Sequence, residues 1–121
     1  MQYMLLIYSP PGDWSSVPPE QQQAIMEAYG SFSEEIQASG KLVAGDALQA
    51  TSTATSIRVR DGETLTTDGP FAETKEVLGG YYLIDVETLD EALEWGAKIP
   101  GAQWGTIEVR PVVTDYETMS S

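Results

Sequence analysis

The chain begins with a short run that is apolar on both of its alternating sets. Between Gln2 and Tyr8 these sets are Tyr3, Leu5 and Ile7 on one side and Met4, Leu6 and Tyr8 on the other. A strand has this pattern when neither face of its sheet meets water. The segment from Leu78 to Val86 repeats it, with Tyr81 and Leu83 alternating with Tyr82, Ile84 and Val86. Both segments are therefore predicted to be central strands of one sheet.

Two other stretches have the spacing of helices. In the first, apolar residues recur every three or four positions, at Ile25, Tyr29, Phe32 and Ile36. Pro18 and Pro19 suit its first turn, with Ser16 as a candidate cap, and Ser39-Gly40 should end it. The second begins at a capping box, Thr88 to Glu91, and should stop at Pro100. Each helix is expected to place one apolar stripe on a core.

The remaining strands are shorter. They are predicted at Leu42 to Leu48, Ile57 to Arg60, Glu63 to Thr67 and Thr106 to Val113. Asp61-Gly62 joins the middle two as a hairpin. A two-residue turn would set Arg58 opposite Leu65, whereas a three-residue turn with a left-handed Gly62 sets Ile57 opposite Leu65. We favour the three-residue turn because it pairs two apolar side chains.

This order of elements predicts an α+β protein with a ferredoxin-like βαββαβ fold and an inserted β-hairpin. One domain is expected over residues 1–113, and residues 114–121 are expected to form an acidic, flexible tail. Right-handed crossovers place both helices on one face of the sheet, so the apolar set on the other face needs a cover. We expect a second copy of the chain to supply it, in a homodimer. The alternative is that the inserted hairpin folds back over this face.

The amino-acid composition excludes several kinds of binding partner and catalytic group. The sequence has 19 acidic and 6 basic residues, a net charge of -13, and neither cysteine nor histidine. Such a surface repels nucleic acid and anionic membranes, and the first apolar run is too short to cross a membrane or to serve as a signal peptide, so we expect a cytoplasmic protein. Disulfides and thiolate chemistry are excluded, and acid–base work must fall to carboxylates, lysine or tyrosine.

One segment carries a recognisable motif. Asp68-Gly69-Pro70-Phe71 is followed by Glu73 to Glu76 and by Gly79-Gly80, a run dense in turn-forming residues. Here the sequence resembles the DGPF-domain group of the YCII-related family. The resemblance extends over nearly the whole chain, including Trp14, Tyr29, the segments Phe32 to Glu35 and Leu42 to Leu48, and the stretch from Leu83 to Pro111.

The resemblance implies a dimeric α+β barrel, in which two ferredoxin-like sheets pack face to face. It also implies a group of largely undefined activity, often found beside genes for extracytoplasmic-function sigma factors, with lactone isomerases and oxygenases on the same fold. The YCII members proper have a proposed active site that pairs histidine with aspartate. Because this chain has no histidine, only an aspartate-centred version can apply.

The motif region supplies the candidate site residues. Asp68 is the candidate general base, the alternative being an aspartate that caps its own turn. Lys75 is a candidate for catalysis or for binding an anionic substrate, or else part of an ordinary salt-bridge network. Arg58, on a strand face shared with Arg60, would clamp a carboxylate, or else keep a sheet edge solvated. Phe71 and Glu73 complete the ligand-binding candidates of this region.

Aromatic residues elsewhere in the chain add to this site or to the core. Tyr81 is assigned to ligand binding, and the same pocket would take Tyr29, Tyr82, Trp14, Trp95 and Trp104 unless these are plain core residues. Glu73, Glu76 and Asp46 offer oxygen ligands for Mg²⁺, but their spacing matches no known loop, so we predict no metal site.

Three functional hypotheses remain open. The first is a small-molecule protein, enzyme or binder, with a cleft near Asp68, Phe71 and Lys75 that supports proton transfer. The second is a regulatory or interaction module, with a sigma factor as its partner. The third is that the motif only builds the fold. The sequence implies no cofactor and does not decide whether the protein is an enzyme.

Overall fold

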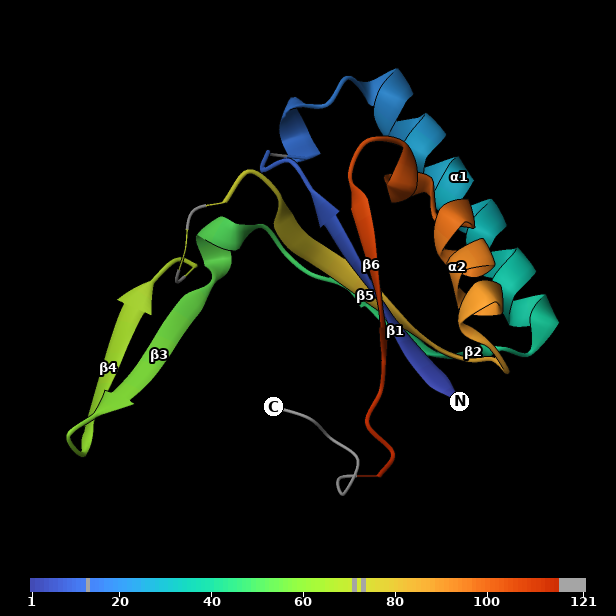
Figure 1. The fold of residues 1–121 in the computed structure, drawn as a ribbon. Helices are drawn as coiled ribbons and strands as arrows, with labels where there is room; N and C mark the ends of the chain where they lie inside the picture. Colours follow the sequence, from blue (N-terminus) through green and yellow to red (C-terminus); the bar gives the residue numbers. More distant parts are fainter. Residues whose placement is uncertain (13, 71, 73, 116–121) are drawn as a thin grey trace.

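Two helices pack against one face of a four-stranded antiparallel sheet (Figure 1). The computed structural model describes residues 1–12, 14–70, 72 and 74–115. Its helices and strands are β1 (Gln2–Ser9), α1 (Pro19–Ser39), β2 (Leu42–Ala47), β3 (Thr55–Arg60), β4 (Glu63–Asp68), β5 (Val77–Asp85), α2 (Leu89–Lys98) and β6 (Thr106–Pro111). Short 3-10 turns are formed by Trp14–Ser16, Thr51–Thr53 and Pro100–Gln103. The ferredoxin-like α+β fold is thereby confirmed.

The strand order of the sheet is β2-β5-β1-β6. The chain therefore makes two crossovers of the same kind: β1–α1–β2 passes over β5, and β5–α2–β6 passes over β1. Such crossovers are right-handed in nearly all proteins, which is why α1 and α2 share a face. The two strands with two-sided apolar patterns occupy the centre, as predicted.

The core lies between the sheet and the two helices. One alternating set of β1 and β5 faces it, and the helices close over that set with their own apolar stripes. Its buried members are Tyr3, Leu5, Phe32, Ile36, Ile84, Val86, Ala92 and Ile99. Phe32 packs edge-on against Tyr82 and Trp95, with ring centroids 5.1 and 6.2 Å away. The helical spacing that begins at Ile25 thus leads into the core from Phe32 onward.

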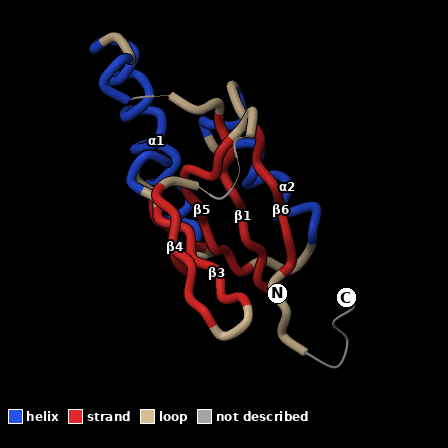
Figure 2. The backbone as a smooth tube through the Cα atoms, turned by 90° about the vertical axis from the view of Figure 1, so that its left-hand side faces the viewer, coloured by secondary structure: helices blue, strands red, loops and turns tan. Residues whose placement is uncertain are grey.

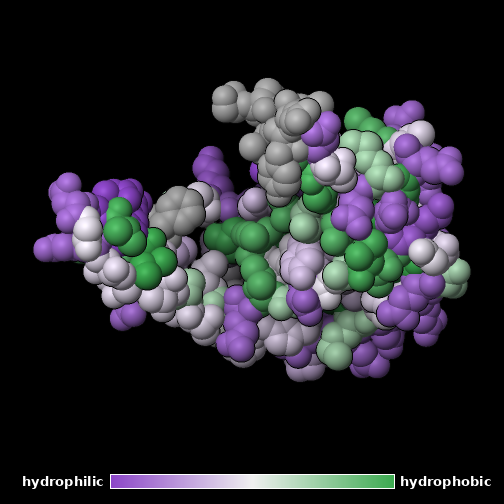
Figure 3. Space-filling model, turned by 90° about the horizontal axis from the view of Figure 1, so that it is seen from below, coloured by the Kyte–Doolittle hydropathy of each residue, from purple (hydrophilic) through white to green (hydrophobic). Residues whose placement is uncertain are grey.

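The opposite face of the sheet carries the other apolar set. Met4 pairs with Leu83, and Leu6 pairs with Tyr81, all four partly exposed. None of the described helices covers this face: Figure 1 shows both of them on the side of the sheet away from the arm, and Figure 2 shows them behind the sheet. Figure 3 shows apolar side chains on the side of the body toward the hairpin. We call the set Met4, Leu6, Tyr8, Tyr81 and Leu83 the open face.

The β3–β4 hairpin stands apart from the four-stranded sheet as a two-stranded arm (Figure 1). Ile57 and Val59 are 65% and 59% exposed, so the arm does not pack on the open face of its own chain. The alternative in which the hairpin folds back over that face is not what the structure shows.

The turn of the arm corrects the predicted pairing. Asp61 and Gly62 have φ angles of 52° and 77°, and Arg58 lies opposite Leu65. This is a two-residue turn with both central residues left-handed, so the predicted three-residue turn was wrong. The twist of such a turn matches the twist of the strands, and that match outweighs one apolar pair on an exposed hairpin.

The helix ends largely follow the sequence signals. Gly40 closes α1 with a left-handed φ of 74°, and the Thr88 hydroxyl accepts a hydrogen bond from the Glu91 amide at 3.1 Å. Ser16 is not the cap of α1, because it ends the 3-10 turn Trp14–Ser16 and Pro18, two residues later, takes the cap position. The proline pair, with its fixed φ, sets the start of the helix.

Gly105 is required by the close approach of two chain segments. A Cβ at this position would lie 2.1 Å from the carbonyl oxygen of Tyr8 and 3.1 Å from the Cα of Ser9, both backbone atoms. We expect Gly105→Ala to lower the free energy of unfolding in urea by about 1–3 kcal/mol, the usual cost of overpacking. The matched control is Gly30→Ala in α1, where nothing lies within 4 Å of the new methyl group.

Gly30→Ala should raise the stability by roughly 0.5–1 kcal/mol, because alanine is the better helix former. Equal stabilities of the two variants would contradict the close approach at Gly105.

Candidate functional site

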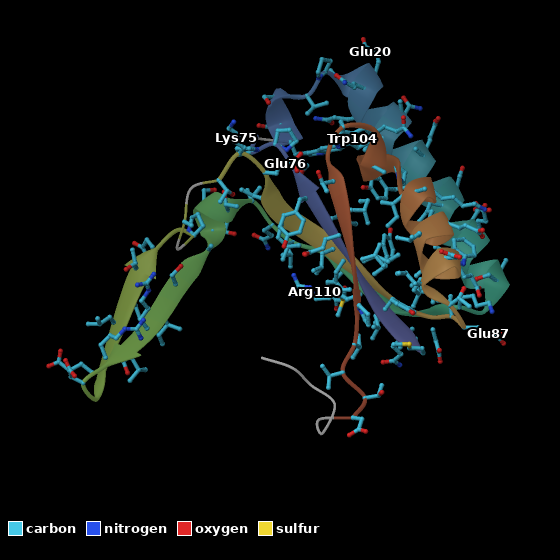
Figure 4. All side chains as sticks on the ribbon, in the orientation of Figure 1. Glu20, Lys75, Glu76, Glu87, Trp104 and Arg110 are labelled. Carbon is cyan, nitrogen blue, oxygen red and sulfur yellow. The ribbon has the colours of Figure 1, made fainter. Side chains whose placement is uncertain are left out.

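A cleft of about 1000 Å³ opens between α1, the loop that precedes it and the helix-facing side of the sheet. From the end of β1 and this loop, the lining residues are Ser9, Pro10, Gly12, Trp14, Ser16 and Val17, and the sheet contributes parts of β1, β2 and β5. Its aromatic lining residues are Trp14, Tyr29, Tyr81, Tyr82 and Trp104. Trp104 lies near the end of the sheet where β6 begins (Figure 4). A mostly apolar cleft with a few polar groups is the usual form of a small-molecule site.

Glycine and alanine keep the walls of the cleft thin. Gly45, Gly79 and Gly80 line it from the sheet, and Ala24 and Ala28 line it from α1. A Cβ at Gly45 would lie 2.7 Å from the Tyr82 ring, and one at Gly80 would lie 3.0 Å from the Asp46 carbonyl oxygen. Larger residues at Gly45 or Gly80 would therefore displace the Tyr82 ring or the neighbouring strand. The shape of the cleft depends on small residues at these positions.

Two tyrosines provide neutral polar groups within the cleft. Burial raises the pKa of the Tyr29 phenol above 10.0, an effect that a hydrogen bond with the Gly101 backbone partly offsets and the nearby Tyr82 reinforces. Burial likewise raises the pKa of Tyr82, and a hydrogen bond with Ser33 partly offsets it. Both phenols are protonated at neutral pH, so each offers a hydrogen-bond donor among apolar walls.

A third tyrosine is tied to a carboxylate at the sheet. The Tyr81 hydroxyl donates to Oδ2 of Asp46 at 3.0 Å, across the pairing of β2 with β5. This hydrogen bond, together with the negative charge of Asp46, raises the pKa of Tyr81 above 10.0. Among the described residues that line the cleft, Asp46 is the one that carries a charge. Asp46 pairs with Tyr81 and Tyr81 pairs with Leu6, so the side chains of this tyrosine and carboxylate lie on the open face, opposite α1.

The predicted site residues do not gather in this cleft. Asp68 ends β4 opposite Thr55, and Arg58 lies on β3. Lys75 lies in the loop before β5 (Figure 4). All three are exposed, and none lines the cleft. Tyr81 does line it. Phe71 and Glu73 lie outside the described residues, and their assignment to ligand binding stays a prediction.

Around Asp68 the motif closes the base of the arm. The Gly69 amide donates to the Ala54 carbonyl at 2.6 Å, and the Ser56 hydroxyl donates to the Gly69 carbonyl at 2.9 Å. Gly69 has a φ of 94°, a conformation that glycine adopts without strain. Glu76, at the other end of this loop, accepts a hydrogen bond from Thr106 at 2.7 Å. The described part of the motif region therefore has a clear structural role, and its catalytic role stays a prediction.

The sequence pointed to most of the aromatic lining residues but missed two polar lining residues of α1. Trp95 is the exception among the aromatics, because it packs against Phe32 in the core with the Lys98 ammonium 5.0 Å from its ring centre. Ser33 and Gln37 were missed. They follow Tyr29 at intervals of four on α1, so the helical period was the signal that pointed to them.

The described residues were compared with the requirements of a metal site and of a membrane-spanning helix. In residues 1–12, 14–70, 72 and 74–115, no three acidic side chains gather where they would hold a metal ion. In the same ranges, neither helix is long and apolar enough to cross a membrane.

The raised pKa values of the cleft tyrosines predict a pH dependence. As pH rises, the unfolded chain ionises these phenols first, so the stability they contribute is complete below pH 10 and is lost as pH passes their folded pKa. Replacing Tyr29 and Tyr82 together by phenylalanine should flatten the alkaline fall of the unfolding free energy measured in urea.

The control for this experiment is Tyr8→Phe, which removes a tyrosine outside the cleft and leaves both cleft phenols in place. An unchanged alkaline fall in the double variant would mean that Tyr29 and Tyr82 ionise equally in both states.

Comparison with known proteins identifies relatives of the chain. Residues 1–115 match the YCII-related domain. An uncharacterized protein of Rhizobium meliloti (strain 1021) is 38% identical over 114 residues, which cover 93% of this chain and 92% of the relative. The finer resemblance to the DGPF-domain group stays a prediction. The match over almost the whole length shows that this chain belongs to the YCII-related family.

Proposed function

We propose that the protein is a homodimer that binds a small organic molecule in the cleft between α1 and the sheet. The observation that carries this proposal is the cleft itself, about 1000 Å³ in volume and lined mainly by aromatic and aliphatic side chains. Ligand sites fall in this size range and have this composition. The neutral phenols of Tyr29 and Tyr82 would fix the orientation of the ligand by donating hydrogen bonds.

Proton transfer by Asp68 and Lys75 is a separate part of the proposal. Neither residue lines the cleft within one chain, so binding does not depend on them. What supports their role is the chemistry of a carboxylate and an ammonium in a chain without histidine. Arg58 on the arm is the matching candidate for an anionic group.

Filling the cleft tests ligand binding. A screen of metabolites by thermal shift should find a compound that stabilises the protein, by about 2.7 kcal/mol at a hundredfold its Kd. Ala28→Phe places a ring in the cleft and should abolish this stabilisation. The matched control is Ala38→Phe on the same helix, whose site does not line the cleft and which should retain it.

Compounds that stabilise both variants equally would bind elsewhere, and the proposal would then be wrong.

The homodimer is supported by the open face. Burying its five large side chains on each subunit would contribute on the order of 7–15 kcal/mol of gross transfer free energy, against association costs of similar scale. Soluble monomers rarely leave an apolar patch of this kind uncovered. A two-fold arrangement would pack the same face of each subunit against the other.

A charge on the open face should break this dimer. Leu6 pairs with Tyr81 on one side and with Glu108 on the other, so it lies well inside the sheet. We expect Leu6→Glu to lower the mass measured by light scattering at micromolar concentration from twice 13.2 kDa to 13.2 kDa. Leu93→Glu is the matched control, because Leu93 on α2 is already 47% exposed and the dimer should persist.

A wild-type mass of 13.2 kDa, or a Leu6→Glu variant that stays dimeric, would refute the proposed interface.

A second candidate function is an interaction module. The exposed apolar side chains of the arm favour it, because Ile57, Val59 and Leu65 are 65%, 59% and 47% exposed on a hairpin that packs on nothing in the four-stranded sheet. The family resemblance suggests an extracytoplasmic-function sigma factor as the partner. A ligand that stabilises the wild type but not Ala28→Phe favours the small-molecule function over this one.

A further inference from the structure

In the part of the chain that the structure describes, no charged side chain faces the interior of the cleft. No described lysine or arginine lines it. The charged lining residue, Asp46, pairs with Tyr81, and Tyr81 pairs with Leu6 of the open face, so its carboxylate lies on the other side of the sheet. A charged group that entered the cleft would therefore leave water without a described partner of opposite charge. The lining favours an uncharged ligand.

Two phenols from opposite walls of the cleft lie near each other. Tyr29, Ser33 and Gln37 line the cleft from α1 at intervals of four residues, so they share one face of the helix. Tyr82 lies across from them, because it pairs with Leu5, a buried core residue on the helix-facing side of the sheet. It is close enough to Tyr29 to contribute to the raised pKa of that phenol. The polar groups of the cleft are therefore concentrated in one part of it.

Each of these phenol oxygens accepts a hydrogen bond from the protein. The Gly101 backbone bonds to Tyr29, Ser33 bonds to Tyr82, and each bond lowers the pKa of its phenol against the effect of burial. A bond that lowers the pKa of a phenol is one that the oxygen accepts, because such a bond stabilises the phenolate. Each bond thus leaves the O–H hydrogen of its phenol available to donate to a ligand.

Apolar side chains line the cleft beyond the phenols. From the loop and the first half of α1, they include Trp14, Ala24, Ile25 and Ala28. A ligand in the cleft therefore meets apolar walls along its body and O–H donors at one part of its length. The net charge of -13 opposes an anion, because it gives the surface of the chain a negative potential. A ligand that accepts hydrogen bonds without carrying a charge satisfies all of these conditions.

Building on the proposed binding function, we infer that the cleft takes an uncharged carbonyl compound, an apolar or aromatic body that carries a ketone, ester or amide oxygen. The body lies against the apolar residues of α1 and of the loop before it. The carbonyl oxygen accepts hydrogen bonds from the hydroxyls of Tyr29 and Tyr82. A carbonyl oxygen suits this position because it has two lone pairs and no proton of its own.

Four probes that share one aromatic ring test the ligand class. Acetophenone is the neutral carbonyl compound, ethylbenzene lacks its oxygen, benzoate is an anion, and benzylamine is a cation at neutral pH. Each is titrated into the isotope-labelled wild-type protein and followed by NMR. We expect acetophenone to bind at least about fivefold more tightly than each of the others. One net hydrogen bond contributes about this factor over ethylbenzene, and the two ions lose their hydration without gaining a partner.

Tyr29→Phe and Tyr82→Phe identify the donors. Each change removes one hydroxyl and keeps the ring, so the affinity for acetophenone should fall about fivefold while the affinity for ethylbenzene stays the same. A loss of packing would not produce this difference, because a damaged cleft weakens the binding of both probes. The matched control is Tyr3→Phe, which removes a hydroxyl from a core tyrosine that does not line the cleft. It should leave both affinities unchanged.

The outcomes separate this inference from the proposed function. Equal binding of acetophenone and ethylbenzene, preference for benzoate or benzylamine, or an unaltered affinity for acetophenone in both tyrosine variants would overturn the carbonyl class while leaving the cleft as a binding site. Failure of all four probes to bind the wild type would also overturn it. Binding of acetophenone that Ala28→Phe does not reduce would instead place the ligand outside the cleft and refute the proposed function.

Discussion

The antiparallel pairing of β1 with β5 is the interaction on which the rest of the structure depends. These two strands occupy the centre of the sheet, and each has an apolar set on both sides. On one side α1 and α2 pack against the apolar side chains of these strands and form the core with them. On the other side they form the open face. One pair of strands therefore fixes the position of the core, of the face proposed for dimerisation and of one wall of the cleft.

Much of this arrangement followed from the periodicity of the sequence. Three local signals correctly predicted the observed elements: the two-sided strands, the helical spacing from Ile25 to Ile36 and the capping threonine Thr88. Each of them depends on residues close together in the sequence. The turn at Asp61-Gly62 was misjudged because an apolar pair was weighed above the twist of the strands. On an arm with little burial, backbone geometry decides the register.

The cleft was predicted in part. Aromatic residues signalled an apolar pocket, and Tyr29, Tyr81 and Tyr82 do line one. Its position did not follow from the sequence, because it depends on how the loop before α1 passes over the ends of β1 and β5. The motif at Asp68 drew attention to the arm, where dense turn chemistry serves the backbone through Gly69. Without tertiary placement, residues that build a turn and residues that bind a ligand look alike.

The separation of the arm from the sheet has a consequence for folding. A lone two-stranded hairpin in water is only marginally stable, whereas the body has a core of eight buried apolar side chains. The arm can therefore open while the body stays intact, so one chain contains two cooperative units of unequal stability. The fraction of molecules with an ordered arm would then depend on protein or partner concentration. Contact with another molecule buries apolar side chains of the arm that stay exposed in the isolated chain.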